Sequence, residues 1–374
     1  MIRTHIEPQA AASSRVDATL STGSERAEIF FRSNEPILSG TAESLLAIAL
    51  LPAMRGHHAL QLGGPLSPRL LASTPTIQDI FHCWDSGLSR VPVEADASDH
   101  QPSPAGGRVG TFFSGGVDSF YSLLKHESEI TDLIFVHGYD IALHDAGLRA
   151  RTSENIQKVA AGYGKHVVEV ETNLRAVLQV AVKWDFCHGA VMAAIAHLLS
   201  GAFRRIYIPS THTYADLFPW GSHPVLDPLW STEVLELVHD GCEATRVEKV
   251  DLIAQSDVAL ATLRVCWKNP KGAYNCGRCE KCVRTMLNLA AAGAIDRCTT
   301  FSEPLTPRRV MALTILDSNT RAFASENLAA LQARNRSPEL QDALQRILNR
   351  SAVANVIHRH KERLRRQYPS MFPR

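Results

Sequence analysis

Residues 112–124, FFSGGVDSFYSLL, combine paired glycines, two serines and an aspartate where an apolar strand is expected to give way to a helix. Glycines let the backbone turn tightly and let a ligand approach without a Cβ in the way. The free amides that open the helix, together with the hydroxyls of Ser114 and Ser119, form a site for an anion. Asp118 cannot donate when ionised, so we expect it to bind Mg²⁺ or a loop amide. The stretch predicts a site for a phosphate chain that carries a metal ion.

A tight strand-to-helix turn capped by Asp118 is the alternative interpretation of this stretch. The residues contain neither the Gly-Lys-Ser/Thr of a Walker sequence nor a Gly-x-Gly-x-x-Gly fingerprint. All six positions from 114 to 119 nevertheless carry residues suited to phosphate, behind a strand and ahead of a helix, which favours the phosphate site.

The sequence SGGVDS resembles the pyrophosphate-binding loop of the PP-loop (N-type) ATP pyrophosphatase superfamily, whose members transfer AMP from ATP to a substrate oxygen and release pyrophosphate. The resemblance implies an α/β fold with a doubly wound parallel sheet of the PP-loop or HUP type. It also implies that adenine lies along the end of the second strand, where a plain buried strand end is the alternative for His137. The residues implied in ATP binding are Ser114, Gly115, Gly116, Val117, Asp118, Ser119, Val136 and His137, and Ser114, Asp118 and Ser119 are those implied in catalysis.

Four of the eight cysteines lie within residues 266–282, CWKNPKGAYNCGRCEKC. The repeated Cys-x-x-Cys spacing aims three sulfurs at one point, and a fourth from the preceding loop completes a tetrahedron. We expect a structural zinc ion, because a closed site of four thiolates suits zinc and no Cys-Pro follows. An iron–sulfur cluster is the alternative that the spacing also suits. The expected ligands are Cys266, Cys276, Cys279 and Cys282.

A PP-loop followed by Cys-x9-Cys-x-x-Cys-x-x-Cys is similar to the QueC family, the cyano-deazaguanine synthases of queuosine biosynthesis. The similarity covers residues 108–292, about half of the chain. It implies an enzyme that adenylates a carboxylate twice, with ammonia as the nucleophile, and makes a nitrile by way of an amide. The chain departs from that family because 107 residues precede this region and 82 follow it. The resemblance therefore supports the chemistry better than the substrate.

Residues 208–233, IPSTHTYADLFPWGSHPVLDPLWSTE, follow an expected strand and are rich in Ser, Thr, His, Asp and Trp. Ligands of doubly wound sheets bind outside the carboxyl ends of the strands, so this segment is a candidate lining of the substrate pocket. A long surface loop is equally compatible with its composition. The candidate substrate contacts are Ser210, His212, Asp216 and His223, with Ser222 and Asp227 as further candidates.

The alternation of strands and helices after residue 107 predicts a parallel sheet with helices on both faces. A linker rich in Pro, Ser and Asp, residues 96–107, separates this part from the residues before it. The expected organisation is a disordered N-terminus (1–25), an N-terminal α+β domain (26–107), a PP-loop ATP-binding α/β domain (108–260), and a zinc-bearing helical C-terminal region (261–374).

Composition fits a globular protein, with 45% hydrophobic and 21% charged residues and a net charge of +1. This charge gives no global attraction to nucleic acid or membrane, and no apolar run reaches the roughly 20 residues that span a bilayer. We therefore expect a cytoplasmic protein with no membrane partner, and a homodimer is compatible with the sequence. Basic residues 358–369 could grip tRNA or an acidic partner, although a solvated face is the simpler interpretation.

The leading expectation is an ATP-dependent ligase or synthase of the C–N bond-forming type, with ATP, Mg²⁺ and Zn²⁺ as cofactors and a small or macromolecular carboxylate as substrate. One alternative is a tRNA-modifying sulfur transferase, which would need a reactive cysteine such as Cys187 or the cysteine cluster. We otherwise interpret Cys187 as a core residue. Arg246 and Lys249 could touch phosphate, but solvated helix charges are the simpler interpretation. The other alternative is a non-catalytic nucleotide-sensing module.

Overall fold

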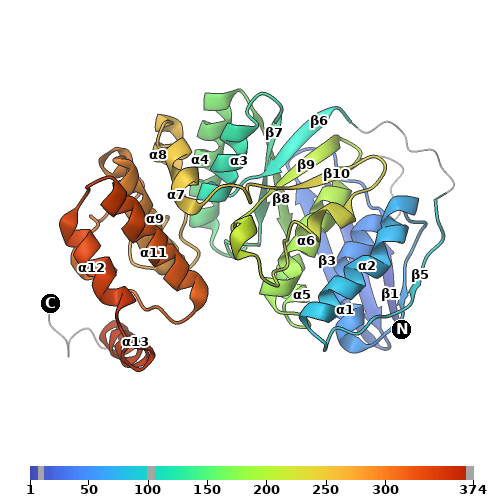
Figure 1. Ribbon diagram of the computed structural model, residues 1–374. Coiled ribbons are helices and arrows are strands. Elements are labelled where there is room, and N and C mark those ends of the chain that lie inside the picture. The colour runs from blue at the N-terminus through green and yellow to red at the C-terminus, as the bar shows by residue number, and fades with distance from the viewer. Residues whose placement is uncertain (7–11, 99–105, 368–374) are drawn as a thin grey trace. The chain divides into compact units, whose positions relative to one another are not determined.

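The computed structural model describes residues 1–6, 12–98 and 106–367. Its chain forms two compact units. The first comprises Met1–Ser114 and Asp118–Glu243, and the second comprises Gly115–Val117 and Ala244–Arg374. Figure 1 shows the first unit as a sheet with helices on both faces and the second as a group of helices.

The first unit is built on one ten-stranded sheet with the order β10-β9-β6-β7-β8-β3-β2-β1-β4-β5. The five strands from β10 to β8 are mutually parallel, and β3 joins β8 in the antiparallel sense. The expectation of an α/β fold with a mostly parallel sheet is confirmed. The strands are β1 (Ile2–Ile6), β2 (Arg15–Thr22), β3 (Glu25–Ser33), β4 (Leu60–Gln61), β5 (Val93–Glu94), β6 (Arg108–Phe112), β7 (Asp132–His137), β8 (His166–Thr172), β9 (Phe203–Pro209) and β10 (Glu236–Asp240).

Helices cover both faces of this sheet, as Figure 1 shows. Every residue of β7 is buried, which is typical of a parallel strand covered on both sides. One face carries α1 (Ala42–Gly56), α2 (Pro68–Trp84), α5 (Leu174–Leu178) and α6 (Trp184–Leu198), and the other carries α3 (Val117–Lys125) and α4 (Ala146–Tyr163).

The N-terminal residues differ from expectation. Residues 1–25 do not form a disordered segment where the structure describes them, because β1 and β2 pair with each other and β2 pairs with β3. Nor do residues 26–107 form a separate domain. Main-chain pairing of β3 with β8 and one shared apolar core, which contains both Phe31 and Val170, unite them with the parallel strands. The tertiary partner overrides the weak local propensity of these polar strands.

The main segment of the second unit begins at Ala244, earlier than the expected boundary at residue 261, and is helical. Its apolar core contains Val283, Leu287, Leu331 and Leu344. Its helices are α7 (Arg246–Ile253), α8 (Asp257–Thr262), α9 (Glu280–Ala292), α10 (Pro307–Met311), α11 (Ser318–Ala333), α12 (Pro338–Leu348) and α13 (Ala352–Gln367), and short 3-10 turns η1 (Tyr214–Asp216), η2 (Asp227–Trp230), η3 (Pro270–Gly272) and η4 (Ile295–Arg297) occur along the two units.

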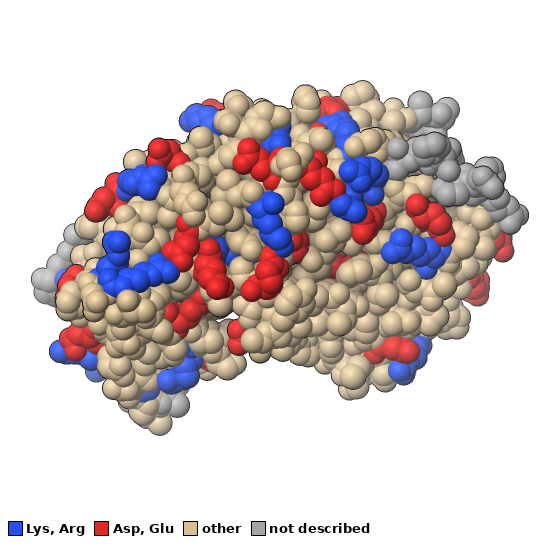
Figure 2. All heavy atoms as spheres, turned by 45° about the horizontal axis from the view of Figure 1, so that its top comes forward, with Lys and Arg blue, Asp and Glu red and all other residues tan. Residues whose placement is uncertain are grey.

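The face of the molecule that Figure 2 presents is mixed in charge. Figure 2 shows basic and acidic side chains interspersed on the face it presents, in keeping with the net charge of +1. None of the helices in the described ranges combines the length and the apolar character needed to cross a bilayer.

Candidate functional site

The glycine–serine loop connects the end of β6 to the start of α3. Gly115 has φ +76°, in the left-handed region that favours glycine, so the turn depends on this residue. The helix that follows begins at Val117, directly after the paired glycines. The local geometry is that of a tight strand-to-helix turn, which both interpretations of this stretch require.

Hydrogen bonds hold α3 against the end of β10. Asp240 accepts from Ser122 Oγ at 2.6 Å and from Lys125 Nζ at 2.8 Å. His126 Nε2 also lies 2.9 Å from this carboxylate. These contacts fix the helix that carries Asp118 and Ser119 beside the carboxyl ends of the neighbouring strands.

Asp118 reaches the segment that follows β9. Thr211 Oγ1 donates to Asp118 Oδ2 at 3.3 Å. Ser119 is buried, whereas Ser114 and Asp118 are half-buried. Solvent therefore reaches Ser114 and Asp118 but not Ser119. The carboxylate of Asp118 adjoins the residues that follow β9.

At the end of β7, the ring of His137 is engaged in hydrogen bonds within the protein. Its Nε2 donates to Glu169 at 2.8 Å, and its Nδ1 accepts from Arg149 Nε at 3.2 Å. Both ring nitrogens are therefore engaged, which supports the buried-strand interpretation of His137. Val136 is also buried, so any contact with adenine at this strand end would use the backbone or an apolar surface.

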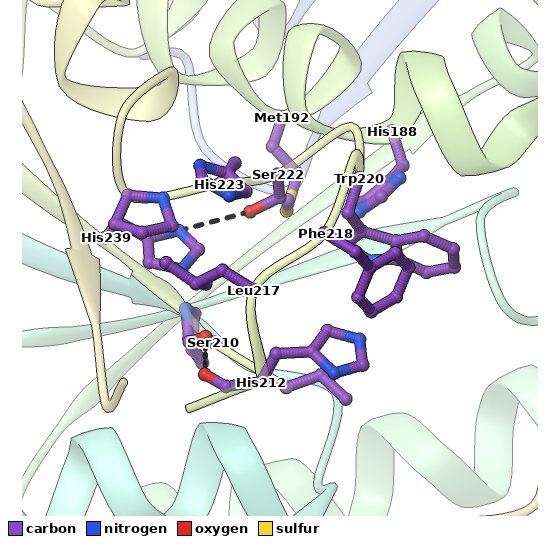
Figure 3. Close-up of a pocket in the computed structure, with 13 residues that line it drawn as sticks. His188, Met192, Ser210, His212, Leu217, Phe218, Trp220, Ser222, His223 and His239 are labelled. Carbon is purple, nitrogen blue, oxygen red and sulfur yellow. Dashed lines mark hydrogen bonds between the residues drawn. The ribbon is translucent and has the colours of Figure 1, made fainter. Parts of the chain in front are cut away.

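A pocket with a cavity volume of about 100 Å³, partly open to solvent, lies at the carboxyl ends of β9 and β10. Figure 3 shows Phe218 and Trp220 on one side and His223 and His239 on the other. The ring of His212 contacts Phe218, with centroids 4.6 Å apart. The lining residues are His188, Met192, Pro209, Ser210, Thr211, His212, Leu217, Phe218, Trp220, Ser222, His223, Pro224 and His239.

His239 and Asp227 form a buried pair in the wall of this pocket. The Nδ1 of His239 lies 2.7 Å from Asp227 Oδ2, and Ser222 Oγ donates to the same oxygen at 2.6 Å. Burial disfavours the charged imidazole, but the hydrogen bond to Asp227, with a smaller effect of Cys242, outweighs it and raises the pKa of His239 to about 9. The pocket therefore presents a positively charged ring at neutral pH.

The pocket brings together three of the four residues expected to contact substrate. Ser210, His212 and His223 line it, as does the further candidate Ser222. Asp216 is exposed in η1, where its Oδ2 accepts from Thr213 Oγ1 at 2.8 Å, and does not line the pocket. The further candidate Asp227 does not line the pocket but contacts His239, which does.

Sequence reasoning missed the pocket residues that come from other segments. His188 and Met192 belong to α6, and His239 belongs to β10. The sequence signal for the α6 residues is a pair of glycines, Gly189 and Gly221, which let the helix and the loop approach each other closely. A Cβ on Gly189 would lie 1.9 Å from the carbonyl oxygen of Gly221, so the helix and the loop can approach only because both residues are glycine.

The four cysteines of residues 266–282 form a second site, in the second unit. Their sulfurs all lie within 4.8 Å of one another, with 4.0 Å between Cys266 and Cys279 and 3.8 Å between Cys276 and Cys282. Sulfurs bound tetrahedrally to zinc at about 2.3 Å would lie roughly 3.8 Å apart. The cluster could therefore hold a metal ion such as zinc.

Local contacts pre-arrange this cluster. Asn275 Oδ1 accepts from the amides of Val265 and Cys266, at 2.9 and 3.2 Å, and its Nδ2 donates to Leu263 O at 2.8 Å. These bonds fix Cys266 beside the Cys-x-x-Cys turns. Hydrogen bonding from Cys276, with the other two thiols, holds the pKa of Cys266 well below its usual range, whereas hydrogen bonding from Cys266 raises the pKa values of Cys279 and Cys282. A bound metal ion would therefore have to displace protons from the latter two thiols.

The remaining candidates are buried. Cys187 has no exposed surface, and burial raises the pKa of its thiol to about 12, so it is a core residue. Arg246 and Lys249 are also buried, so interpreting them as solvated helix charges is wrong.

Comparison with family models, curated proteins and solved structures found no match.

Proposed function

We propose that this chain is an ATP-dependent enzyme that transfers AMP to a carboxylate or amide oxygen and releases pyrophosphate. Ammonia or another nucleophile then displaces AMP, so that a C–N bond forms. The observation that carries the proposal is the hydrogen bond from Thr211 to Asp118. It puts an aspartate of the glycine–serine loop next to the pocket at the carboxyl ends of β9 and β10, where α/β sheets bind their ligands.

The loop suits a pyrophosphate leaving group. Helix-opening amides and the hydroxyls of Ser114 and Ser119 would stabilise the negative charge that develops as the bond between the α- and β-phosphates breaks. The loop lacks the lysine with which Walker sequences bind the β- and γ-phosphates. Asp118 would hold Mg²⁺, which neutralises phosphate charge when bound.

The pocket suits an organic acid. In the proposed reaction the substrate oxygen attacks the α-phosphorus, pyrophosphate leaves, and the nucleophile then attacks the activated carbon while AMP departs. The imidazolium of His239, whose charge is partly balanced by Asp227, can orient the carboxylate, and the rings of Phe218 and Trp220 supply an apolar wall. Zinc in the cysteine cluster would be structural, since four thiolates leave no open position for substrate.

The proposal is tested with ATP labelled at the γ-phosphate and a panel of carboxylic acids that includes deazaguanine acids. We expect the label in pyrophosphate, with AMP as the second product. Asp118→Ala should lower turnover by about 100-fold or more, whereas Asp296→Ala, at an exposed aspartate of the second unit, should not. Label in free phosphate together with ADP, with contaminating pyrophosphatase excluded, would overturn the proposal.

The sulfur-transferase alternative is weakened by the burial of Cys187, because of the two sulfur carriers considered above only the cysteine cluster remains. Metal analysis separates the two functions. Iron with labile sulfide would favour sulfur transfer, and zinc would favour adenylation with a structural metal site.

A further inference from the structure

Helix α13, the last one within the described residues, packs on the second unit through one face. Asn355 is buried, its Nδ2 donates to Arg350 O at 3.3 Å, and its Oδ1 accepts from the amide of Ile315 at 3.4 Å. His358, three residues further on, is half-buried. Residues three apart share a helix face, so the packed face of α13 runs through these two positions.

A different face of α13 carries exposed aliphatic side chains. Val353, Val356 and Ile357 are 69%, 60% and 50% exposed. Their spacing of three and four residues puts them on one face, which we call the aliphatic stripe. Because each residue turns a helix by about 100°, Asn355 lies roughly opposite this stripe, and the packing that buries Asn355 leaves the stripe uncovered.

Positive charge is concentrated in the same helix. Arg359, His360 and Lys361 are exposed and follow directly on the stripe. The sequence of α13 (Ala352–Gln367) contains five Lys and Arg residues but one acidic residue, Glu362, although the whole chain has a net charge of only +1. The net charge therefore hides a local basic segment that coincides with exposed apolar surface.

We propose that α13 binds to the surface of an anionic lipid bilayer, with the aliphatic stripe in the interface and Arg359 and Lys361 against lipid phosphates. Exposed apolar side chains joined to a cluster of Lys and Arg on one helix are the combination that such surfaces recognise. The expectation of no membrane partner rested on net charge and on the lack of a spanning segment, and surface binding depends on neither.

A second copy of the chain, nucleic acid and a partner protein would each match only one of the two properties of this face, its charge or its apolar character. A second copy of α13 would bring two basic helices together, which like charges oppose. Nucleic acid would match the charge, but valine and isoleucine offer bases no ring on which to stack. A groove on a partner protein needs pockets shaped to its anchors, and valine is under-represented among interface hot spots. A bilayer accepts short aliphatic side chains without such pockets.

The test is flotation of the full chain with vesicles of phosphatidylcholine alone, or of phosphatidylcholine with phosphatidylserine, in low and high salt. One variant removes the stripe (V356E with I357E) and another reverses the charge (R359E with K361E). The matched control is V180E, which alters an 87% exposed valine in the first unit. Metal content and melting temperature of each variant report whether the second unit remains folded.

We expect the wild type and V180E to float with the phosphatidylserine vesicles, less so at high salt, and both α13 variants to bind about tenfold more weakly or worse. Failure of the wild type to bind phosphatidylserine vesicles would overturn the proposal. So would a stripe variant that binds them as the wild type does. Binding of bulk tRNA that the stripe variant retains, with no vesicle binding, would instead assign α13 to nucleic acid.

Discussion

In the pocket of the first unit, an imidazole keeps its charge although water barely reaches it. The side chains of His239 and Asp227 are 3% and 0% exposed. Such a pair is stable only while both partners are charged, because removing one partner leaves an uncompensated charge in the interior. The charge of the pocket and the stability of the first unit are therefore coupled to the same proton.

This coupling predicts a pH dependence. The pKa of His239 is raised from 6.5 to about 9, so its contribution to stability is complete below pH 6.5 and is lost as the pH rises through 9. We expect the free energy of unfolding to fall across this range by up to about 3 kcal/mol. Urea unfolding at several pH values measures it. The fall should vanish in His239→Gln and persist in His166→Gln, which alters an exposed histidine; an identical fall in both variants would contradict the prediction.

The cysteine cluster gives a second prediction for single residues. We expect one zinc ion per chain, held by Cys266, Cys276, Cys279 and Cys282, and none in Cys279→Ser. Cys83→Ser, at an exposed cysteine outside the cluster, should keep its zinc. Elemental analysis of purified protein measures both, and iron with sulfide in the wild type would refute the zinc assignment.

Among the elements, the contact between α6 and the loop after β9 shapes the pocket. Gly189 on the helix and Gly221 in the loop allow backbone to meet backbone, and a Cβ on Gly221 would lie 2.7 Å from the carbonyl of Phe186. This approach brings His188 beside Trp220, with ring centroids 5.1 Å apart. Two glycines thus determine which aromatic residues the pocket contains.

We expect Gly189→Ala to destabilise the first unit by about 1–3 kcal/mol, since the new methyl group would meet the Gly221 carbonyl. Gly147→Ala is the matched control, because it lies in helix α4 with nothing within 4 Å of its Cβ. It should be neutral, or stabilising by up to about 1 kcal/mol, through better helix propensity. Chemical denaturation of the two variants compares them, and equal stabilities would contradict this account.

The same elements show what a sequence can reveal. Ser210, His212 and His223 could be predicted as pocket residues because they follow a recognisable strand, and ligands bind at strand ends. His188 and His239 could not be predicted, because the sequences of α6 and β10 are typical of core elements. Only the packing of these elements brings the two histidines to the pocket. The cysteine cluster was predictable in full, since its geometry follows from short-range spacing. Strands β1 and β2 were not predictable, because they become ordered only by pairing with each other and with β3.

For the whole molecule, each unit has its own apolar core. The cysteine cluster lies in the second unit. We expect calorimetry to resolve two unfolding transitions. Chelation of the metal should lower the midpoint of only one of them, because metal binding is coupled to the folding of the unit that holds it. A single transition that shifts as a whole on chelation would show that the units unfold together.

The junction of β3 with β8 has a consequence for synthesis of the chain. Phe31 pairs with Thr172, so β3 must wait for 141 further residues before its partner strand exists. At about 5–20 residues per second, a ribosome needs roughly 7–30 s to supply them. During that interval the nascent β1–β3 meander has an open edge with an apolar face. Open edges of this kind pair readily with other chains, so the N-terminal strands are where a chaperone that shields emerging polypeptide would be needed first.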